Sequence, residues 1–177
     1  MGSRAAYIGG CVGTACTLSD RDFKIPALGT MAHSWVQLFD SELEPFALTQ
    51  RRTQPTNCLL LVDTYNVLKS GVPNAIRVFD EVLKPLGMRP AGIRIDSGDI
   101  TYLSCKARKM LDEAGYPDCK ICASNSLDEY IIRDMIMQGA RWIPLAWETA
   151  DYGLLRACDG RGIQLPLSNT RRNRDPE

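Results

Sequence analysis

The sequence predicts an α/β protein, an incomplete parallel β/α barrel. Short apolar runs at residues 59–62, 92–95 and 120–123 are separated by amphipathic stretches of helical period. Each run with its following helix spans about 30 residues, as a crossover between parallel strands requires. A closed barrel of this kind has eight such units. The sequence shows four, so we expect only part of a barrel.

The first two units lie in the N-terminal half. Residues 25–29 are expected to form a strand, followed by a helix that begins near Trp35. Residues 59–62 form the next strand, because a continuous apolar run is typical of a strand buried on both faces. Pro73 near its start and Gly87 at its end delimit the helix that follows.

The next two units repeat this pattern. Residues 92–95 form a strand, and the helix after it ends at Gly115. Residues 120–123 form another strand, followed by a helix from about Leu127 toward Gly139. The carboxyl ends of parallel strands share one edge, where ligands bind. We therefore expect the polar residues after the strands to meet there: Asp63, Asp96 and Asn125.

Composition favours a small-molecule partner. The 21 basic and 21 acidic side chains balance, so nothing indicates nucleic acid or an anionic membrane surface as partner. No apolar run reaches the roughly 20 residues that span a bilayer, and the first residues lack the apolar stretch of a signal peptide. We expect a cytoplasmic protein with reduced thiols. Cys119 and Cys122 have CxxC spacing, but they lie in a predicted strand and are expected to be buried thiols.

The segment GIRIDSGD combines a cation, two carboxylates and a small-residue turn before a helix. Arg94 could bind a carboxylate or phosphate bidentately, and Ser97 and Gly98 could offer backbone N–H groups to an anion. The alternative is structural: Arg94 pairs with Asp96, and Ser97 or Asp99 caps the helix. The residues alone leave both readings open.

His33, the only histidine, lies in the segment GTMAHS between a predicted strand and a helix. Imidazole there could act as base, nucleophile or phosphate acceptor, although a lone histidine is more often structural. Asp63 could bind ribose hydroxyls or magnesium, or cap a turn. Ser124 and Asn125 could bind ligand or start a helix.

In this order, GTMAHSWVQ, LLVDTYNVLKSGVPNAI, GIRIDSGD and ASNSLDE resemble nicotinate phosphoribosyltransferase of the bacterial type, over nearly all of residues 5–139. The resemblance implies a type II phosphoribosyltransferase barrel that joins nicotinate to phosphoribosyl pyrophosphate, giving nicotinate mononucleotide in the salvage route of NAD biosynthesis. It also implies Mg²⁺ as cofactor, coupled ATP hydrolysis and a homodimer of the full-length protein.

The resemblance assigns roles to individual residues. His33 takes the position of the phosphorylated histidine and Asp96 that of a second catalytic residue, whereas no metal ligand is assigned. The positions expected to bind substrate are Thr30, Ser34, Asp63, Arg94, Ser97, Gly98, Ser124 and Asn125.

The resemblance stops after Ala140. We expect residues 1–140 to be a partial barrel domain and give residues 141–177 no domain assignment. Codons for this tail, read in another frame, permit Asp-Ser-Phe-Gly-Val-Gly from Trp142 and later Pro-Val-Met-Gly-Gly-Val-Tyr, both similar to the family's continuation. We therefore hypothesise a frame-shifted tail and expect this chain to be inactive, without the phosphate-binding turn. An uninterrupted frame in the encoding DNA would contradict the hypothesis.

Three alternatives remain at this stage. The protein could use nicotinamide or quinolinate, although quinolinate would call for a more basic pocket than Arg94 alone provides. It could be a non-catalytic fragment of the same barrel. An aldolase-like barrel would need a Schiff-base lysine at a strand end, and none of the predicted strands offers one.

Overall fold

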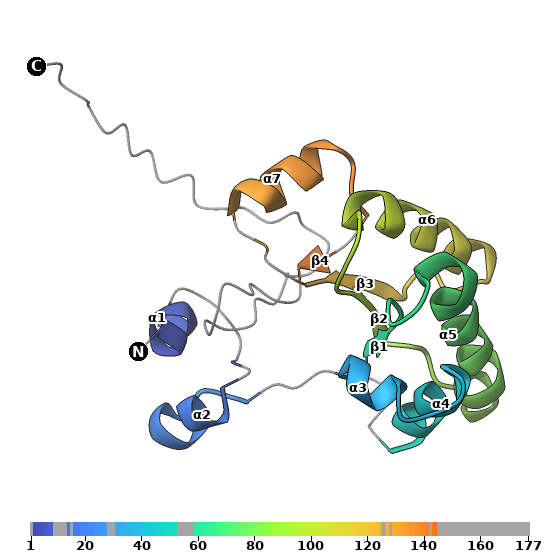
Figure 1. The fold of residues 1–177 in the computed structure, drawn as a ribbon, viewed down its shortest axis with the longest axis horizontal. Coiled ribbons are helices and arrows are strands. Elements are labelled where there is room, and N and C mark those ends of the chain that lie inside the picture. Colours follow the sequence, from blue (N-terminus) through green and yellow to red (C-terminus); the bar gives the residue numbers. More distant parts are fainter. Residues whose placement is uncertain are drawn as a thin grey trace, which may run out of the picture.

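A parallel sheet forms the centre of the computed structural model, which describes residues 2–8, 14, 16–27, 31–52, 59–124, 127, 129–141 and 143–144. The strands lie side by side in chain order (Figure 1): β1 (Leu59–Leu61), β2 (Gly92–Ile95), β3 (Lys120–Ala123) and β4 (Ile143–Pro144). All three pairings are parallel. The prediction of an α/β protein with a parallel sheet is therefore confirmed.

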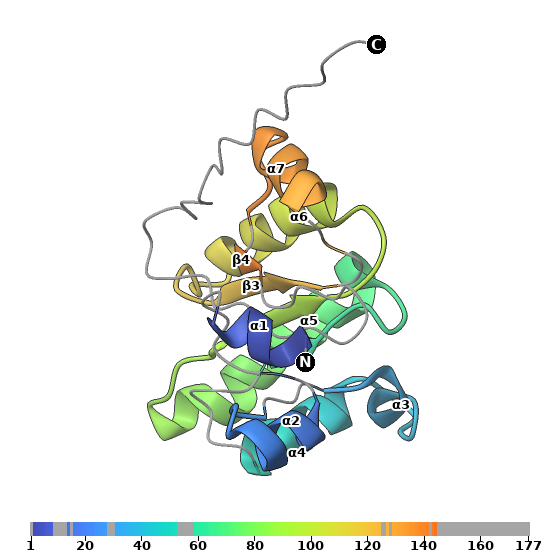
Figure 2. The ribbon, with the colours of Figure 1, turned by 90° about the vertical axis from the view of Figure 1, so that its left-hand side faces the viewer.

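The helices that connect the strands lie together on one side of the sheet, whereas the two N-terminal helices lie apart from them (Figures 1 and 2). The α-helices are α1 (Gly2–Ile8), α2 (Thr17–Phe23), α3 (His33–Val36), α4 (Leu43–Arg52), α5 (Val72–Val78), α6 (Ile100–Glu113) and α7 (Glu129–Met137). Around α5 lie two π-helical segments, η2 (Val67–Gly71) and η3 (Phe79–Leu83), and a 3-10 turn, η4 (Lys84–Leu86). The expected crossover from β1 to β2 is thus one long helical segment of changing pitch.

The core lies between the sheet and the helices α4 to α7. Leu60, Ile93 and Ile121 from three strands are almost fully buried, as are Phe79 and Leu83 of η3. Each such side chain contributes about 1.5–3 kcal/mol when it leaves water. The largest buried side chains are Phe46, Phe79, Ile25, Leu60, Leu61, Leu83, Ile93, Ile95, Leu111, Ile121, Leu127 and Ile132.

Local signals end the helices where the sequence predicts. Gly87 and Gly115 adopt φ angles of 67° and 84°, which only glycine takes without strain. Asp99 caps the start of α6, because its Oδ1 accepts a hydrogen bond from the backbone N–H of Tyr102 at 3.0 Å. The structural reading of Asp99 is therefore confirmed.

The N-terminal unit is less regular than predicted in the residues that the structure describes. Of the strand expected at residues 25–29, Ala27 makes an isolated parallel bridge with Thr14, residues 25–27 form no regular strand, and residues 28–29 lie outside the described part. Pro26 has no N–H to donate to a ladder, although its carbonyl accepts from Thr14. The helix expected to begin near Trp35 is present as the single turn α3, which begins at His33 and is followed by the longer α4.

The described residues neither close the sheet into a barrel nor test the predicted domain boundary. Ile143 and Pro144 form β4 just beyond residue 140, whereas residues 145–177 lie outside the described part. The frame-shifted tail therefore stays a prediction. In the described part of the chain, no helix has the length and apolar character needed to cross a membrane.

Candidate functional site

The carboxyl ends of β1, β2 and β3 bring several predicted site residues together. Parallel pairing aligns Leu61 with Arg94 and Arg94 with Cys122. The hydrogen-bond ladder continues one step further, because Ser124 donates its N–H to the carbonyl of Ile95 at 3.0 Å. Side chains just beyond the three strands therefore face one another, as expected for the edge where ligands bind.

Asp63 connects the ends of β1 and β2. Its Oδ2 accepts hydrogen bonds from the backbone N–H of Asp96 at 3.0 Å and from the Ser97 hydroxyl at 2.6 Å. The Asp63 side chain is 1% exposed, and its Oδ1 is buried without a hydrogen-bond partner. Buried carboxylate oxygens normally have a hydrogen-bond partner, so this oxygen can accept a hydrogen bond from a ligand.

Arg94 and Asp96 form the ion pair that the structural reading expects. The Arg94 Nη2 donates to Asp96 Oδ1 at 2.5 Å, and its Nε donates to the Ser124 hydroxyl at 2.7 Å. That hydroxyl in turn donates to Asp96 Oδ1. A further guanidinium nitrogen donates to the carbonyl of Met31 at 3.3 Å. A substrate contact of Arg94 stays a prediction.

These contacts determine the charge of Asp96. Burial raises the pKa of this carboxyl, but the hydrogen bond from Ser124 and the charge and hydrogen bond of Arg94 lower it by more, with a smaller contribution from His33. The pKa of Asp96 therefore lies below its usual value, and the carboxylate is ionised at neutral pH.

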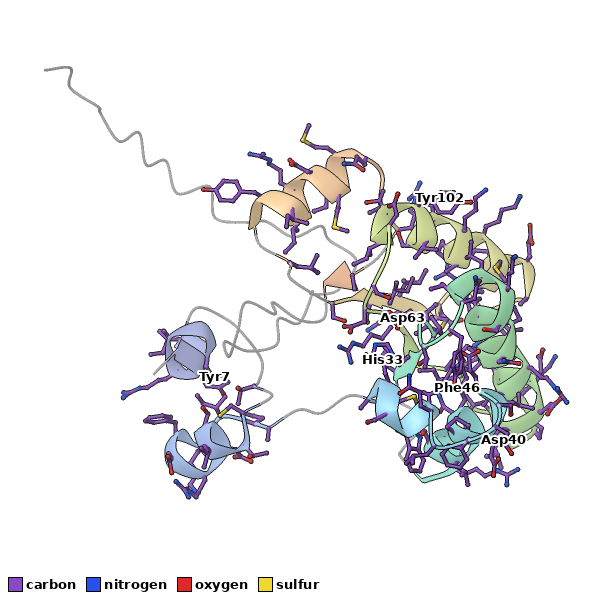
Figure 3. All side chains as sticks on the ribbon, viewed as in Figure 1. Tyr7, His33, Asp40, Phe46, Asp63 and Tyr102 are labelled. Carbon is purple, nitrogen blue, oxygen red and sulfur yellow. The ribbon has the colours of Figure 1, made fainter. Side chains whose placement is uncertain are left out.

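His33 lies in the first turn of α3, close to Asp63 (Figure 3). Its Nε2 lies 3.4 Å from Asp96 Oδ2 and 3.9 Å from Asp63 Oδ1, while Nδ1 lies 3.2 Å from Thr64 Oγ1. The His33 side chain is 39% exposed, so the ring is open to solvent on one side. An accessible imidazole against two carboxylates is suited to nucleophilic or acid–base chemistry.

The remaining predicted residues are placed less centrally or not at all. Gly98 takes a φ of 81° in the turn before α6. Ser34 is exposed on α3 and takes no part in the hydrogen-bond network formed by the described residues. Thr30 and Asn125 lie outside the described residues. Thr64 is not among the predicted residues, although its place directly after Asp63 at a strand end is a signal for it.

The CxxC pair is structural, as predicted. Cys119 and Cys122 are free and buried, and burial raises the pKa of each thiol to about 12. The described residues contain no group of three or more His, Cys, Asp or Glu side chains that could hold a metal ion.

Curated proteins similar in sequence are nicotinate phosphoribosyltransferases. The chain is 48% identical to the Bacillus subtilis enzyme over 140 residues, which cover 79% of the chain and 28% of that protein. It is 44% identical to the Mycobacterium tuberculosis protein pncB2 over 129 residues, 72% of the chain and 26% of that protein. The chain thus spans little more than a quarter of these relatives. No family model matches it.

Solved structures show a similar fold at lower sequence identity. Human nicotinic acid phosphoribosyltransferase aligns with a TM-score of 0.59 and 22% identity, over 79% of this chain and 38% of that one. Nicotinate-nucleotide pyrophosphorylase from Pyrococcus furiosus aligns with a TM-score of 0.61 and 23% identity, over 76% of this chain and 34% of that one. The arrangement of strands and helices is therefore one that known proteins share.

Proposed function

The chain belongs to the nicotinate phosphoribosyltransferase family, and from this premise we propose that its protein joins nicotinate to phosphoribosyl pyrophosphate, releasing pyrophosphate and giving nicotinate mononucleotide for NAD biosynthesis. The observation that carries the proposal is the position of His33 against Asp63 and Asp96 at the strand-end edge. This is the edge at which β/α enzymes bind their substrates.

The reaction requires position and charge more than a base. The ring nitrogen of nicotinate displaces pyrophosphate at the anomeric carbon of the ribose, so the new C–N bond forms as the C–O bond breaks. Positive charge develops on the ribose ring in the transition state. Asp96 Oδ2 and Asp63 Oδ1 both face His33, and carboxyl oxygens there can accept hydrogen bonds from ribose hydroxyls. The ionised Asp96 carboxylate can also stabilise the developing positive charge.

We propose that ATP hydrolysis is coupled to the reaction through His33. A phosphoryl group passes from ATP to the unprotonated ring nitrogen of His33 as the bond to ADP breaks, and the ring keeps its proton on the other nitrogen. The contact of Nε2 with Asp96 supports this role, because an ionised carboxylate stabilises the positive charge that the ring gains. Water later releases phosphate from the histidine.

Mg²⁺ is proposed as the metal. It prefers carboxylate and phosphate oxygens and is usually held by one or two protein carboxylates together with substrate phosphates. The unpaired Oδ1 of Asp63 and the Oδ2 of Asp96 fit this pattern. When bound, the ion would neutralise charge on the leaving pyrophosphate. Asp63 would contribute a ligand that its hydrogen bonds to Ser97 and to the Asp96 backbone already orient.

Three broader proposals accompany this one. The sheet is part of a closed β/α barrel, which the sequential strand order with helices on one side supports. The protein acts in the cytoplasm, which the thiols of Cys105, Cys119 and Cys122, which form no disulfide, support. The full-length protein is a homodimer, an inference from the family resemblance alone.

The test is an assay of the whole protein, expressed from the confirmed reading frame, with nicotinate, nicotinamide and quinolinate as alternative bases. We expect nicotinate to be preferred, and ATP to raise the rate. His33→Asn should abolish the effect of ATP while leaving a slower ATP-independent reaction, whereas Asp96→Asn should lower both.

The outcomes separate the alternatives. A preference for nicotinamide or quinolinate would overturn the proposed substrate. No activity with any base, in a protein that still binds phosphoribosyl pyrophosphate, would indicate a non-catalytic binding protein. An equal effect of ATP in His33→Asn and in the unaltered protein would contradict the role of His33.

A further inference from the structure

A threonine outside the predicted site residues contacts the histidine of the site. Thr64 follows Asp63 directly beyond β1, and its Oγ1 lies 3.2 Å from Nδ1 of His33. The opposite ring nitrogen, Nε2, lies 3.4 Å from Asp96 Oδ2 and 3.9 Å from Asp63 Oδ1. The imidazole therefore has a polar partner at each nitrogen, and these partners come from the ends of two neighbouring strands.

We propose that Thr64 is a positioning residue, whose hydroxyl holds the His33 ring in the orientation in which Nε2 faces Asp96 and Asp63. This rests on the proposed function, because the orientation matters for catalysis only if His33 acts in the reaction. The contact itself can be tested without any activity.

The carboxylates decide which nitrogen carries the proton. The ionised Asp96 carboxylate can only accept hydrogen bonds, so the Nε2 that faces it carries hydrogen. In the neutral ring Nδ1 then has the free lone pair and accepts from the Thr64 hydroxyl. If the ring is protonated, Nδ1–H donates to the same oxygen. A hydroxyl both donates and accepts, so Thr64 holds the ring in either state.

The carboxylate contacts alone are too long to hold the ring. Good N–H···O hydrogen bonds span about 2.7–3.2 Å, and the Nε2 contacts with Asp96 and Asp63 exceed that range. The contact of Nδ1 with Thr64 falls within it. The His33 side chain is 39% exposed at the start of a four-residue helix, so the ring has room to turn. A half-turn about the Cβ–Cγ bond replaces both nitrogens by carbons and loses all three contacts.

The chain is well suited to a direct test, because His33 is its only histidine. Histidine labelled with ¹⁵N gives one pair of ring signals, whose shifts report which nitrogen carries the proton. Thr64→Val keeps the side-chain shape and removes the hydroxyl, whereas Thr64→Ser keeps the hydroxyl. Thr17→Val makes the same change at an exposed position in α2 and serves as the control.

At a pH at which the ring is neutral, we expect the Nε2–H form to dominate in the wild-type chain, in Thr64→Ser and in Thr17→Val. In Thr64→Val the ring loses one hydrogen bond of about 1 kcal/mol, so orientations that turn Nε2 away from Asp96 should become about fivefold more populated. The carboxylate no longer favours Nε2–H in those orientations, so the population of the Nδ1–H form should rise with them. Retention of the wild-type pattern in Thr64→Val would overturn the proposal. An equal change in Thr64→Ser would also overturn it, because packing rather than the hydroxyl would then be responsible.

If Thr64→Val fails to fold, which circular dichroism would show, a second measurement tests the contact in the wild-type chain alone. In the wild-type chain we expect nuclear Overhauser contacts between the ring Hε1 of His33 and the side chain of Thr64, and their absence overturns the proposal. The result is separable from the proposed function. A ring that follows the Thr64 hydroxyl in a protein without phosphoribosyltransferase activity would refute the function and leave the contact established.

Discussion

Replacing Gly71 by alanine tests how closely the first crossover packs against the strand that leads into the site. Gly71 has helical backbone angles, φ −60° and ψ −58°, where alanine is normally favoured over glycine by about 0.5–1 kcal/mol. A Cβ at this position would lie 1.8 Å from the carbonyl oxygen of Val62 and 2.7 Å from its carbonyl carbon. Both atoms are backbone, so no side-chain rotation relieves the overlap.

The expected cost follows from this geometry. Overpacking a core costs about 1–3 kcal/mol when side chains can shift, and more when backbone must move. We expect Gly71→Ala to lower the free energy of unfolding by at least about 3 kcal/mol, which is a large part of a total of about 5–15 kcal/mol. The melting temperature should fall by about 6–12 °C. Val62 directly precedes Asp63, so the displaced backbone should also disturb the site.

Urea and thermal unfolding followed by circular dichroism measure the effect. Gly87→Ala is the control, because its φ is 67° but a Cβ there would have nothing within 4 Å. That variant should lose only about 1–2 kcal/mol, the strain of left-handed backbone. A Gly71→Ala chain as stable as wild type, or more stable, would show that the end of η2 does not approach Val62 as described.

Three further predictions concern the site and its surroundings. Ser124→Ala removes a hydrogen bond that lowers the pKa of Asp96 in the folded chain. This hydrogen bond stabilises the folded chain at pH values above the usual aspartate pKa, and its contribution is lost as the pH falls through the lower pKa of folded Asp96. We expect Ser124→Ala to be less stable than wild type by about 1–2 kcal/mol at pH 7 and the difference to shrink in urea titrations at pH 3, whereas a constant difference would contradict this origin. Cys119 and Cys122, with pKa values raised to about 12, should resist alkylation at pH 8 until the chain unfolds, while the partly exposed Cys105 reacts first. Peptide mass spectrometry distinguishes the three thiols, and equal rates would be inconsistent with burial. Asp99→Ala removes the cap of α6 and should lower the free energy of unfolding by about 1 kcal/mol, measured by thermal unfolding. Asp99→Asn should retain most of the stability that the cap contributes, and equal losses in the two variants would argue against capping.

The strands and helix ends were predictable because short-range chemistry determines them. The apolar runs at β1, β2 and β3 and the glycines that end the helices act locally, so their positions follow from the sequence. The strand expected at residues 25–29 had an apolar character too. Whether such a run forms a strand depends on a neighbour to pair with, and in the described residues Ala27 finds only Thr14.

The site was predictable at the level of residues but not of contacts. Parallel strands bring their carboxyl ends together, so Asp63 and Asp96 were expected near each other. Which oxygen of Asp63 remains unpaired depends on the turn after β2, where the Asp96 N–H and the Ser97 hydroxyl both reach the other oxygen. Such choices arise from three-dimensional geometry, and no spacing in the sequence encodes them.

The two readings of Arg94 are not exclusive once the network is considered. The guanidinium holds Asp96 through Oδ1 together with Ser124, which leaves Asp96 Oδ2 directed at His33. An ion pair that uses one carboxylate oxygen therefore presents the other to the site. The same division occurs in Asp63, whose Oδ2 is bonded within the protein and whose Oδ1 is not. Structural bonds on one side of each carboxylate thus orient the oxygens that can act on a substrate.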